Sequence, residues 1–441
     1  MSGLPATLTG LQRLLAAGAL SKREAIAAQR ERLDRLVGSW PCVVQALSTA
    51  SEATASGTGP LAGIGLAHKD IFDIEGRRPG LGHDRGRPEV GVATAAAIDR
   101  LAVAGATQLA ALTMAEFACG ATGHNPRFAP VNNPLHPDAI VGGSSSGSAV
   151  AVASEMVYGS LGTDTAGSVR IPAATCGLFG LKTTSGLISV QGVFPLAPSL
   201  DGVGLLARSA ADAGQLLAAL VSGAPRRAPL AQPKIKAWLP EGALHPQVES
   251  ALDTFAADCA VQDRCASLPE HRLLTALSEI VLYREAATTH RDGLLSCTLS
   301  DSVQAVALPG LVLEPDWYHA ALRDRPARAR AFCEAHLRSH DILMMPALPQ
   351  PIPDWPTVTA GGPGFDLRQL LALHSLMGFV NYLGFPSLVM PIAKDARGLP
   401  ISVQLMGRPG AEETLLAFAA RAELCRFGGE SPTRYFSQTQ G

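Results

Sequence analysis

Apolar residues recur along the chain with two spacings, one typical of helices and the other of buried strands. Close to the N-terminus, residues 8–20 and 21–37 are predicted to form two helices, and Ser21 followed by Glu24 makes a capping box at the start of the second. Three further helices are predicted at 93–105, 209–221 and 411–424, and two buried strands at 107–117 and 379–391. This alternation of apolar strands and Ala/Leu-rich helices favours an α/β architecture.

The chain has 441 residues, of which 47% are hydrophobic and 17% charged, so it can bury a large core. No long linker rich in Pro, Gly or Ser divides it, and no period of roughly 20 to 50 residues recurs. We therefore expect a helical segment, residues 1–50, packed on the outside of one main domain, residues 51–441. The N-terminal helices are also the candidate surface for a homodimer.

Two polar turns flank one apolar segment in residues 141–172, VGGSSSGSAVAVASEMVYGSLGTDTAGSVRIP. Residues 142–148 form the first predicted turn, 149–156 a buried helix, and 162–168 the second turn. Successive backbone N–H groups in such turns can converge on an anion, as a tetrahedral oxyanion or a phosphate requires. Serine chemistry is therefore the first candidate for this segment.

The first turn has two simpler interpretations. GGSSSGS on its own is most often a flexible loop, and it lacks the Gly-Lys-Ser/Thr ending of a phosphate-binding P-loop. The turn also matches G-x-S-x-G, which would make Ser145 the nucleophile of an α/β-hydrolase, with Asp341 and His374 as partners. That interpretation leaves the second turn unexplained.

A lysine in a third motif adds a candidate base. Residues 60–76, PLAGIGLAHKDIFDIEG, contain an apolar run that ends at Lys69. Together with GGSSSGSAVAVA, GTDTAGSVRIPAATCGLFGLKTT and GLPISVQLMGR, this motif resembles the amidase signature family of serine amidohydrolases over nearly the whole chain. The resemblance implies that family's fold, a central mixed β-sheet sandwiched between α-helices, and makes residues 51–441 one amidase signature domain.

The resemblance also implies roles for individual residues. It places the family's catalytic lysine on Lys69, the bridging serine, which follows a cis peptide bond, on Ser144, and the acyl-forming nucleophile on Ser168. The family's oxyanion hole falls on the backbone N–H groups of Thr165, Ala166, Gly167 and Ser168. Neither a metal nor a cofactor is implied.

These residues make chemical sense together. A serine hydroxyl is a poor nucleophile until a base takes its proton, and a lysine is a base only when it is neutral, which burial favours. Lys69 is therefore expected to be buried, and Ser144 to pass the proton between Lys69 and Ser168. The opposite charges of Asp164 and Arg170 flank the nucleophile and are expected to orient the backbone.

Other polar residues near these motifs receive structural interpretations. On an alternating strand His68 points away from Lys69, so we expect a core or surface histidine. Cys176 is expected to be a buried structural thiol. His124 and His136 are expected to be loop histidines without a catalytic role.

The charge balance excludes some partners. A formal net charge of −2 and a pI near 6.6 argue against a nucleic-acid-binding groove. The eight cysteines form no C-x-x-C pairs, which suits reduced thiols. Neither a secretory signal nor a run of about 18 apolar residues is present, so we expect a cytoplasmic protein without a membrane partner.

The sequence thus predicts a cofactor-free serine amidohydrolase that cleaves the C–N bond of a small carboxamide or urea-like compound and releases ammonia or an amine. Two alternatives stay open: the glutaminase (A-type) subunit of a tRNA-dependent amidotransferase, and a non-catalytic binding protein of the same fold. Substrate selection is expected in the variable residues 268–379, where Arg291, Tyr318, His319 and the loop 357–366 are candidates for the pocket.

Overall fold

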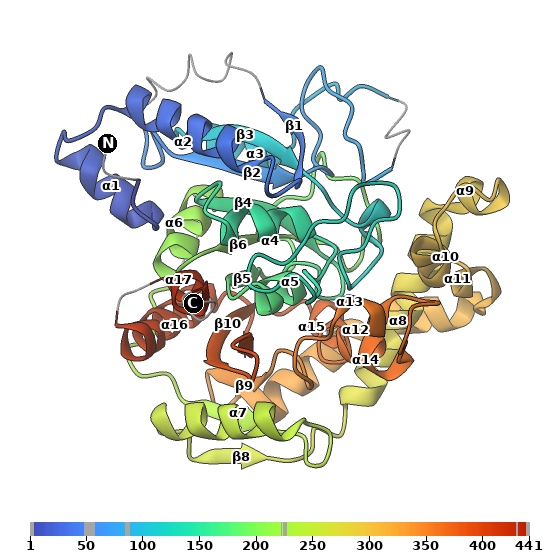
Figure 1. The fold of residues 1–441 in the computed structure, drawn as a ribbon. Helices are drawn as coiled ribbons and strands as arrows, with labels where there is room; N and C mark the ends of the chain where they lie inside the picture. Colours follow the sequence, from blue (N-terminus) through green and yellow to red (C-terminus); the bar gives the residue numbers. More distant parts are fainter. Residues whose placement is uncertain are drawn as a thin grey trace.

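The computed structural model describes residues 4–47, 58–83, 89–221, 223, 227–428 and 431–437. Its centre is one mixed sheet of 11 strands, around which the helices are arranged (Figure 1). In spatial order the strands are β1 (Val43–Ala46), β3 (Thr107–Leu112), β2 (Gly65–Lys69), β4 (Gly159–Asp164), β6 (Gly202–Ala207), β5 (Phe179–Lys182), β10 (Ser387–Lys394), β11 (Pro400–Gly407), β9 (Ile342–Pro346), β7 (Ile235–Trp238) and β8 (Asp263–Cys265). The predicted α/β class with a central mixed sheet is confirmed.

The strand directions bring two sequence motifs to one edge of the sheet. β2 lies between β3 and β4 and is parallel to both. From β4 through β6, β5, β10 and β11 to β9 the pairs are antiparallel, and β9, β7 and β8 are again parallel. Because β2 and β4 are parallel, their last residues, Lys69 and Asp164, lie at the same edge of the sheet.

Helices cover both faces of the sheet (Figure 1). One face carries α1 (Leu8–Ala16), α3 (Ala96–Val103), α6 (Ala210–Leu220), α7 (Pro246–Asp258) and α16 (Glu412–Phe427), and the other carries α4 (Ser146–Ala153), α5 (Arg170–Thr175) and α17 (Pro432–Ser437). Alternate strand residues enter the two cores: Leu388 and Met390 of β10 belong to the first, and Val389 between them belongs to the second.

The segment between β8 and β10 is mostly helical. It contains α8 (His271–Thr289), α9 (Arg291–Leu295), α10 (Asp301–Ala307), α11 (Pro309–Val312), α12 (Pro315–Phe332), η3 (Cys333–Leu337), α13 (Trp355–Val358), α14 (Leu367–Ala372) and α15 (Gly378–Leu383). A third apolar cluster joins α8, α12 and α15 to Leu343 and Met345 of β9. Since β9 is an inner strand, the variable residues 268–379 contribute to the central sheet. Among the described residues, no helix is both long and apolar enough to span a membrane.

The N-terminal helices form largely where the sequence predicted them. α2 (Lys22–Leu36) begins with the expected capping box, in which Ser21 Oγ accepts the N–H of Glu24 at 3.2 Å. α1 is joined to α6 because Asp212 accepts the N–H groups of Leu8 and Thr9, each at 3.0 Å. The expected boundary between residues 50 and 51 lies outside the described residues, so the division into a helical segment and a main domain stays a prediction.

The strand predicted at 107–117 ends early, because β3 stops at Leu112 and η2 (Glu116–Ala118) follows. Two further predicted elements differ from the structure. Residues 379–391 were predicted as a strand region, but α15 occupies the first part and β10 begins only at Ser387. Gly384, at φ = +76°, ends the helix in the left-handed conformation that glycine allows. An apolar run of this kind does not distinguish a buried helix from a buried strand, so the first half of this prediction was wrong.

The other difference is at the first serine turn, where α4 already begins at Ser146. All eight residues of α4 are buried, which confirms the predicted buried helix. Gly147 allows the helix to lie very close to the residue that follows β3, because a Cβ at this position would be 2.6 Å from the carbonyl oxygen of Thr113. The helix therefore holds the turn that precedes it against the end of the sheet.

Candidate functional site

Lys69 ends β2, and its side chain is completely buried. Its Nζ donates hydrogen bonds to Ser144 Oγ and Thr163 Oγ1, each at 2.8 Å. Burial lowers the pKa of Lys69 to about 7, although the carboxylates of Asp201 and Asp164 act in the opposite direction. Near neutral pH a large fraction of this lysine is therefore uncharged and able to accept a proton.

The first turn places Ser144 against this amine. The peptide bond between Gly143 and Ser144 is cis, as the resemblance implied, and the Ser144 side chain is fully buried. Its neighbour Ser145 donates its N–H to the carbonyl oxygen of Ser168 at 3.1 Å. The end of β2 and the two serine turns therefore meet in one place, which makes this the candidate active site.

The second turn is folded around the Asp164 carboxylate. Its Oδ1 accepts the N–H of Gly167 at 2.9 Å, and its Oδ2 accepts the N–H of Val169 at 3.1 Å. Gly167 has φ = +112°, and a Cβ there would lie 2.8 Å from Met377, so both conformation and space require glycine. Ser168 lies between these two anchored residues and, unlike them, is not fully buried.

Arg170 compensates the Asp164 charge in a fully buried ion pair, with 2.8 Å between Nη2 and Oδ1. The guanidinium also donates to the side-chain oxygens of Asn381 and Gln404, each at 2.6 Å. Burial by itself would raise the pKa of Asp164, but Arg170 and Asn381 hold it well below its usual range. The pair thus anchors the backbone of the turn, as the sequence analysis expected.

The N–H groups that were expected to form an oxyanion hole fall into two sets. Within the described residues, those of Thr165, Ala166 and Ser168 make no hydrogen bond to the protein. The fourth differs from the expectation, because the Gly167 N–H is already bonded to Asp164. The turn therefore offers three free donors next to the Ser168 hydroxyl, with Gly167 used to shape the backbone.

Four polar residues of the site were not predicted from the sequence. Thr163 accepts from the buried amine, Asp201 accepts the hydroxyl of Thr165 at 2.5 Å, and Asn381 and Gln404 contact the guanidinium beside them. Thr163 had a local signal, since it lies in the GTDTAGS motif two residues before Thr165. Gln404 lies within the GLPISVQLMGR motif, although nothing in that motif pointed to a contact with the turn, and Asp201 and Asn381 lie far along the chain from the turn without a local signal.

The alternative nucleophile, Ser145, lacks its expected partners. Its hydroxyl is buried and donates to the carbonyl oxygen of Thr163 at 3.4 Å. Asp341 pairs instead with Arg408 at 2.9 Å. In the described part of the chain no hydrogen bond joins Ser145, Asp341 and His374, so nothing there supports the α/β-hydrolase interpretation.

The proposed pocket residues of the variable segment lie elsewhere. Arg291 and His319 are exposed, and the Tyr318 hydroxyl donates to Glu285 at 2.9 Å. Neither these residues nor the loop 357–366 has a hydrogen bond or ring contact with the serine turns within the described residues. The segment approaches the site through the start of α15, where Met377 packs against Gly167.

The structural interpretations of the remaining polar residues agree with their surroundings. His68 is fully buried on β2, as a core histidine. Cys176 is also fully buried, and burial raises the pKa of its thiol to about 12, so it is not a reactive thiolate. His124 and His136 lie between η2 (Glu116–Ala118) and α4, outside regular structure, as predicted for loop histidines.

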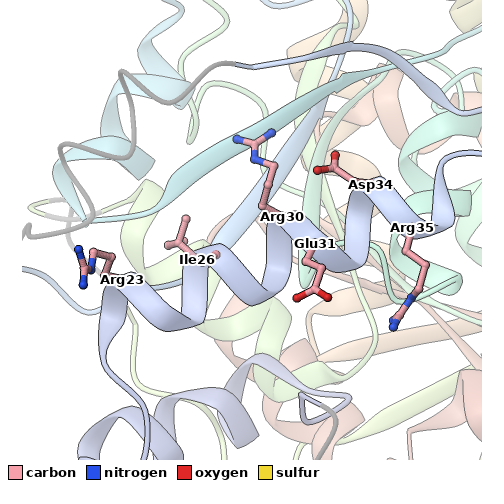
Figure 2. Close-up of a pocket in the computed structure, with 7 residues that line it drawn as sticks. Arg23, Ile26, Arg30, Glu31, Asp34 and Arg35 are labelled. Atoms are coloured by element: carbon pink, nitrogen blue, oxygen red, sulfur yellow. The ribbon is translucent and has the colours of Figure 1, made fainter. Parts of the chain in front are cut away.

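A cavity away from the serine turns has no nucleophilic side chain in its lining. It lies along α2 and has a volume of about 750 Å³ (Figure 2). It is lined by charged and aliphatic side chains and by neither serine nor cysteine: Arg23, Ile26, Ala27, Arg30, Glu31, Asp34 and Arg35. Without a nucleophile in its lining, this cavity does not compete with the serine turns as the candidate active site.

Comparison with known proteins shows similarity over nearly the whole chain. The Amidase family model matches residues 24–271 and 246–416. The A-type subunit of the glutamyl-tRNA(Gln) amidotransferase of Aromatoleum aromaticum is 32% identical over 94% of the chain and 96% of its own length. Amidase 1 of Oryza sativa subsp. japonica is 31% identical over 81% of the chain and 89% of its own length. A shorter match, 42% identical to the corresponding amidotransferase subunit of Chromohalobacter salexigens, spans 48% of the chain and 45% of that protein.

The fold gives the same result as the sequence comparison. A crystal structure of an amidase is 30% identical and superposes with a TM-score of 0.84, covering 95% of this chain and all of that one. Both the sheet and the two serine turns lie inside the matched residues. The chain therefore belongs to the amidase family of enzymes, which act on carbon–nitrogen bonds.

Proposed function

We propose that this protein is a serine amidohydrolase that cleaves the C–N bond of a small carboxamide or urea-like compound through an acyl-enzyme on Ser168. The observation that carries the proposal is the buried amine of Lys69, 2.8 Å from Ser144 Oγ. The turn that holds Ser144 is itself bonded to the turn that holds Ser168. A sheltered base beside a hydroxyl is what an attacking serine requires.

In the proposed reaction the neutral Lys69 takes a proton from Ser144, and Ser144 takes one from Ser168. Ser168 Oγ then forms a bond to the carbonyl carbon, and the free N–H groups of Thr165, Ala166 and Ser168 stabilise the negative charge on the carbonyl oxygen. As the C–N bond breaks, the proton passes from Lys69 through Ser144 to the departing nitrogen. The products of this half are the Ser168 ester and ammonia or an amine.

Water completes the reaction with the same groups. Its proton passes through Ser144 to Lys69 while its oxygen forms a bond to the acyl carbon, and the bond to Ser168 Oγ then breaks. The proton returns to Ser168, which frees the acid and restores the enzyme. Positioned proton transfer of this kind contributes roughly a hundred- to ten-thousandfold to a rate.

A second candidate function is the glutaminase subunit of a tRNA-dependent amidotransferase. The 32% identity with the A-type subunit named for glutamyl-tRNA(Gln) amidotransferase, over 94% of the chain, favours it. The same lysine and serines would then act on glutamine, and the chain would work with partner subunits. In either case we expect a cytoplasmic enzyme whose direct partner is a small amide.

The nucleophile is tested by incubating the purified protein with a fluorophosphonate and measuring its intact mass. We expect one adduct on the wild type and none on Ser168→Ala. The matched control is Ser145→Ala, which removes a neighbouring hydroxyl and should keep the adduct. An adduct that persists in Ser168→Ala would refute Ser168 as the nucleophile, and no adduct on the wild type would favour the non-catalytic alternative.

Release of ammonia separates the two candidate functions. Hydrolysis of simple carboxamides or ureas by the protein alone supports the amidohydrolase. Hydrolysis of glutamine that appears only after partner subunits are added supports the amidotransferase role. In both experiments Ser168→Ala provides the background rate.

A further inference from the structure

Asp201 lies outside the motifs that suggested the active site, just before β6, yet its carboxylate reaches the second serine turn. Its Oδ1 accepts the hydroxyl of Thr165 at 2.5 Å. Its Oδ2 accepts the N–H groups of Leu196 and Ala197 at 2.9 and 3.1 Å. Burial raises the pKa of this carboxylate, and the three donated hydrogen bonds act in the opposite direction by favouring its ionised form.

The hydrogen bond to Asp201 fixes Thr165, a residue with a proposed role in catalysis. Thr165 supplies one of the three free N–H groups next to Ser168, and its side chain is fixed while its N–H stays available. The other side of the carboxylate is fixed by the backbone of residues 196–197. Asp201 therefore connects the turn to a second segment of the chain and restricts the positions that Thr165 can adopt.

We propose that Asp201 is a positioning residue for this site, which holds Thr165 beside Ser168 and places a negative charge within electrostatic reach of the Lys69 amine. The inference rests on the function proposed above. Asp201 would then affect both the N–H donors of the oxyanion hole, through Thr165, and the base, Lys69.

Few groups besides Asp201 interact electrostatically with the Lys69 amine. The groups that interact with the amine come from three segments: Asp201, Asp164 at the end of β4, and Cys119 after η2. Asp164 is compensated by Arg170, and burial raises the pKa of the Cys119 thiol so far that it stays neutral. In the described part of the chain the carboxylate of Asp201 forms no ion pair with an arginine or lysine, so its charge opposes the effect of burial on Lys69.

Two variants separate the two effects. Asp201→Asn removes the charge, keeps the size, and leaves an oxygen that can accept from the backbone of residues 196–197. Thr165→Val removes the hydroxyl and keeps the carboxylate. The rate of fluorophosphonate labelling is measured for each variant across the pH range, together with thermal unfolding to verify that the protein is folded.

In the wild type the labelling rate should rise with pH as Lys69 loses its proton. In Asp201→Asn the midpoint should move to lower pH by up to about one unit, because the charge that favoured the protonated lysine is gone. In Thr165→Val the midpoint should stay in place, while the rate at high pH falls roughly tenfold or more because one oxyanion donor is no longer held.

The possible results are distinct. An unchanged midpoint in a folded Asp201→Asn protein, with normal labelling of the wild type, would overturn the inference and leave the proposed function standing. A wild-type rate at high pH in Thr165→Val would likewise overturn the positioning of Thr165. Absence of labelling in the wild type would instead refute the proposed function. If Asp201→Asn does not fold, Asp201→Glu serves in its place, with an expected wild-type midpoint and a reduced rate, and a shifted midpoint would contradict the inference.

Discussion

Lys69 Nζ and Ser144 Oγ lie 2.8 Å apart in a place that water does not reach, since neither side chain has any exposed surface. The same amine also donates to Thr163 Oγ1 at 2.8 Å. A lysine in such surroundings has two polar neighbours but no carboxylate within ion-pair distance in the described part of the chain. Its protonation state is therefore set mainly by burial, and both activity and stability should depend on it.

The activity should follow the fraction of neutral Lys69. Because burial lowers the pKa of Lys69 to about 7, we expect kcat/KM to rise with pH around a midpoint near that value. Lys69→Arg keeps a cation that cannot act as a base, so it should lose roughly a hundred- to ten-thousandfold at every pH. Hydrolysis rates of both proteins across the neutral range test this, and a flat wild-type profile would contradict it.

The free energy of unfolding should also depend on the titration of Lys69. The folded pKa of about 7 lies below the ordinary value of 10.5, so between these values the unfolded chain binds the additional proton. The free energy of unfolding of the wild type should therefore rise as the pH increases from 7 to 10.5, by at most about 1.4 kcal/mol per pH unit. The rise is measured relative to Lys69→Met, whose side chain does not titrate. Urea unfolding of both proteins at several pH values measures the difference, and a constant difference would argue against the lowered pKa.

The buried pair of Asp164 and Arg170 should be strongly coupled to folding. Arg170→Met leaves the Asp164 carboxylate buried without its cation, and we expect a loss of roughly 3–5 kcal/mol in the free energy of unfolding. The matched control is Arg434→Met, because Arg434 pairs with Glu155 at 2.7 Å but both side chains are partly exposed. That variant should lose less than about 1 kcal/mol, and equal losses in the two would show that burial of the pair is not decisive.

Glu423 should make the protein less stable as the pH rises from 4.5 to about 8. It lies on α16, and burial raises its pKa to about 8, above the ordinary 4.5, although the N–H of Ala210 donates to it at 3.0 Å. The stability that comes from the protonated form is complete below 4.5 and is lost as the pH rises through 8. Glu423→Gln stays neutral, so its melting temperature should increasingly exceed that of the wild type over this range, and no change in the difference would refute the raised pKa.

Elements with short-range signals could be predicted from the sequence. The capping box of Ser21 and Glu24 placed the start of α2, and the predicted helices at 209–221 and 411–424 correspond to α6 and α16. These signals work because a helix start and an apolar helix face involve residues within a few positions of one another. The serine turns and the Lys69 motif could be found for the same reason, since each is a contiguous run of residues.

What the sequence by itself determined was the α/β class, the family motifs and the choice of Lys69, Ser144 and Ser168 as the candidate catalytic residues. Only the tertiary structure decided that Asp201 and Asn381 reach the second turn, that the Gly167 N–H is used by Asp164, and that α15 forms where a strand was expected. The physical reason is that the hydrogen bonds and burial that set these features join residues far apart in the chain. Their partners, and the pKa of a buried group among them, exist only once the sheet and its helices have packed.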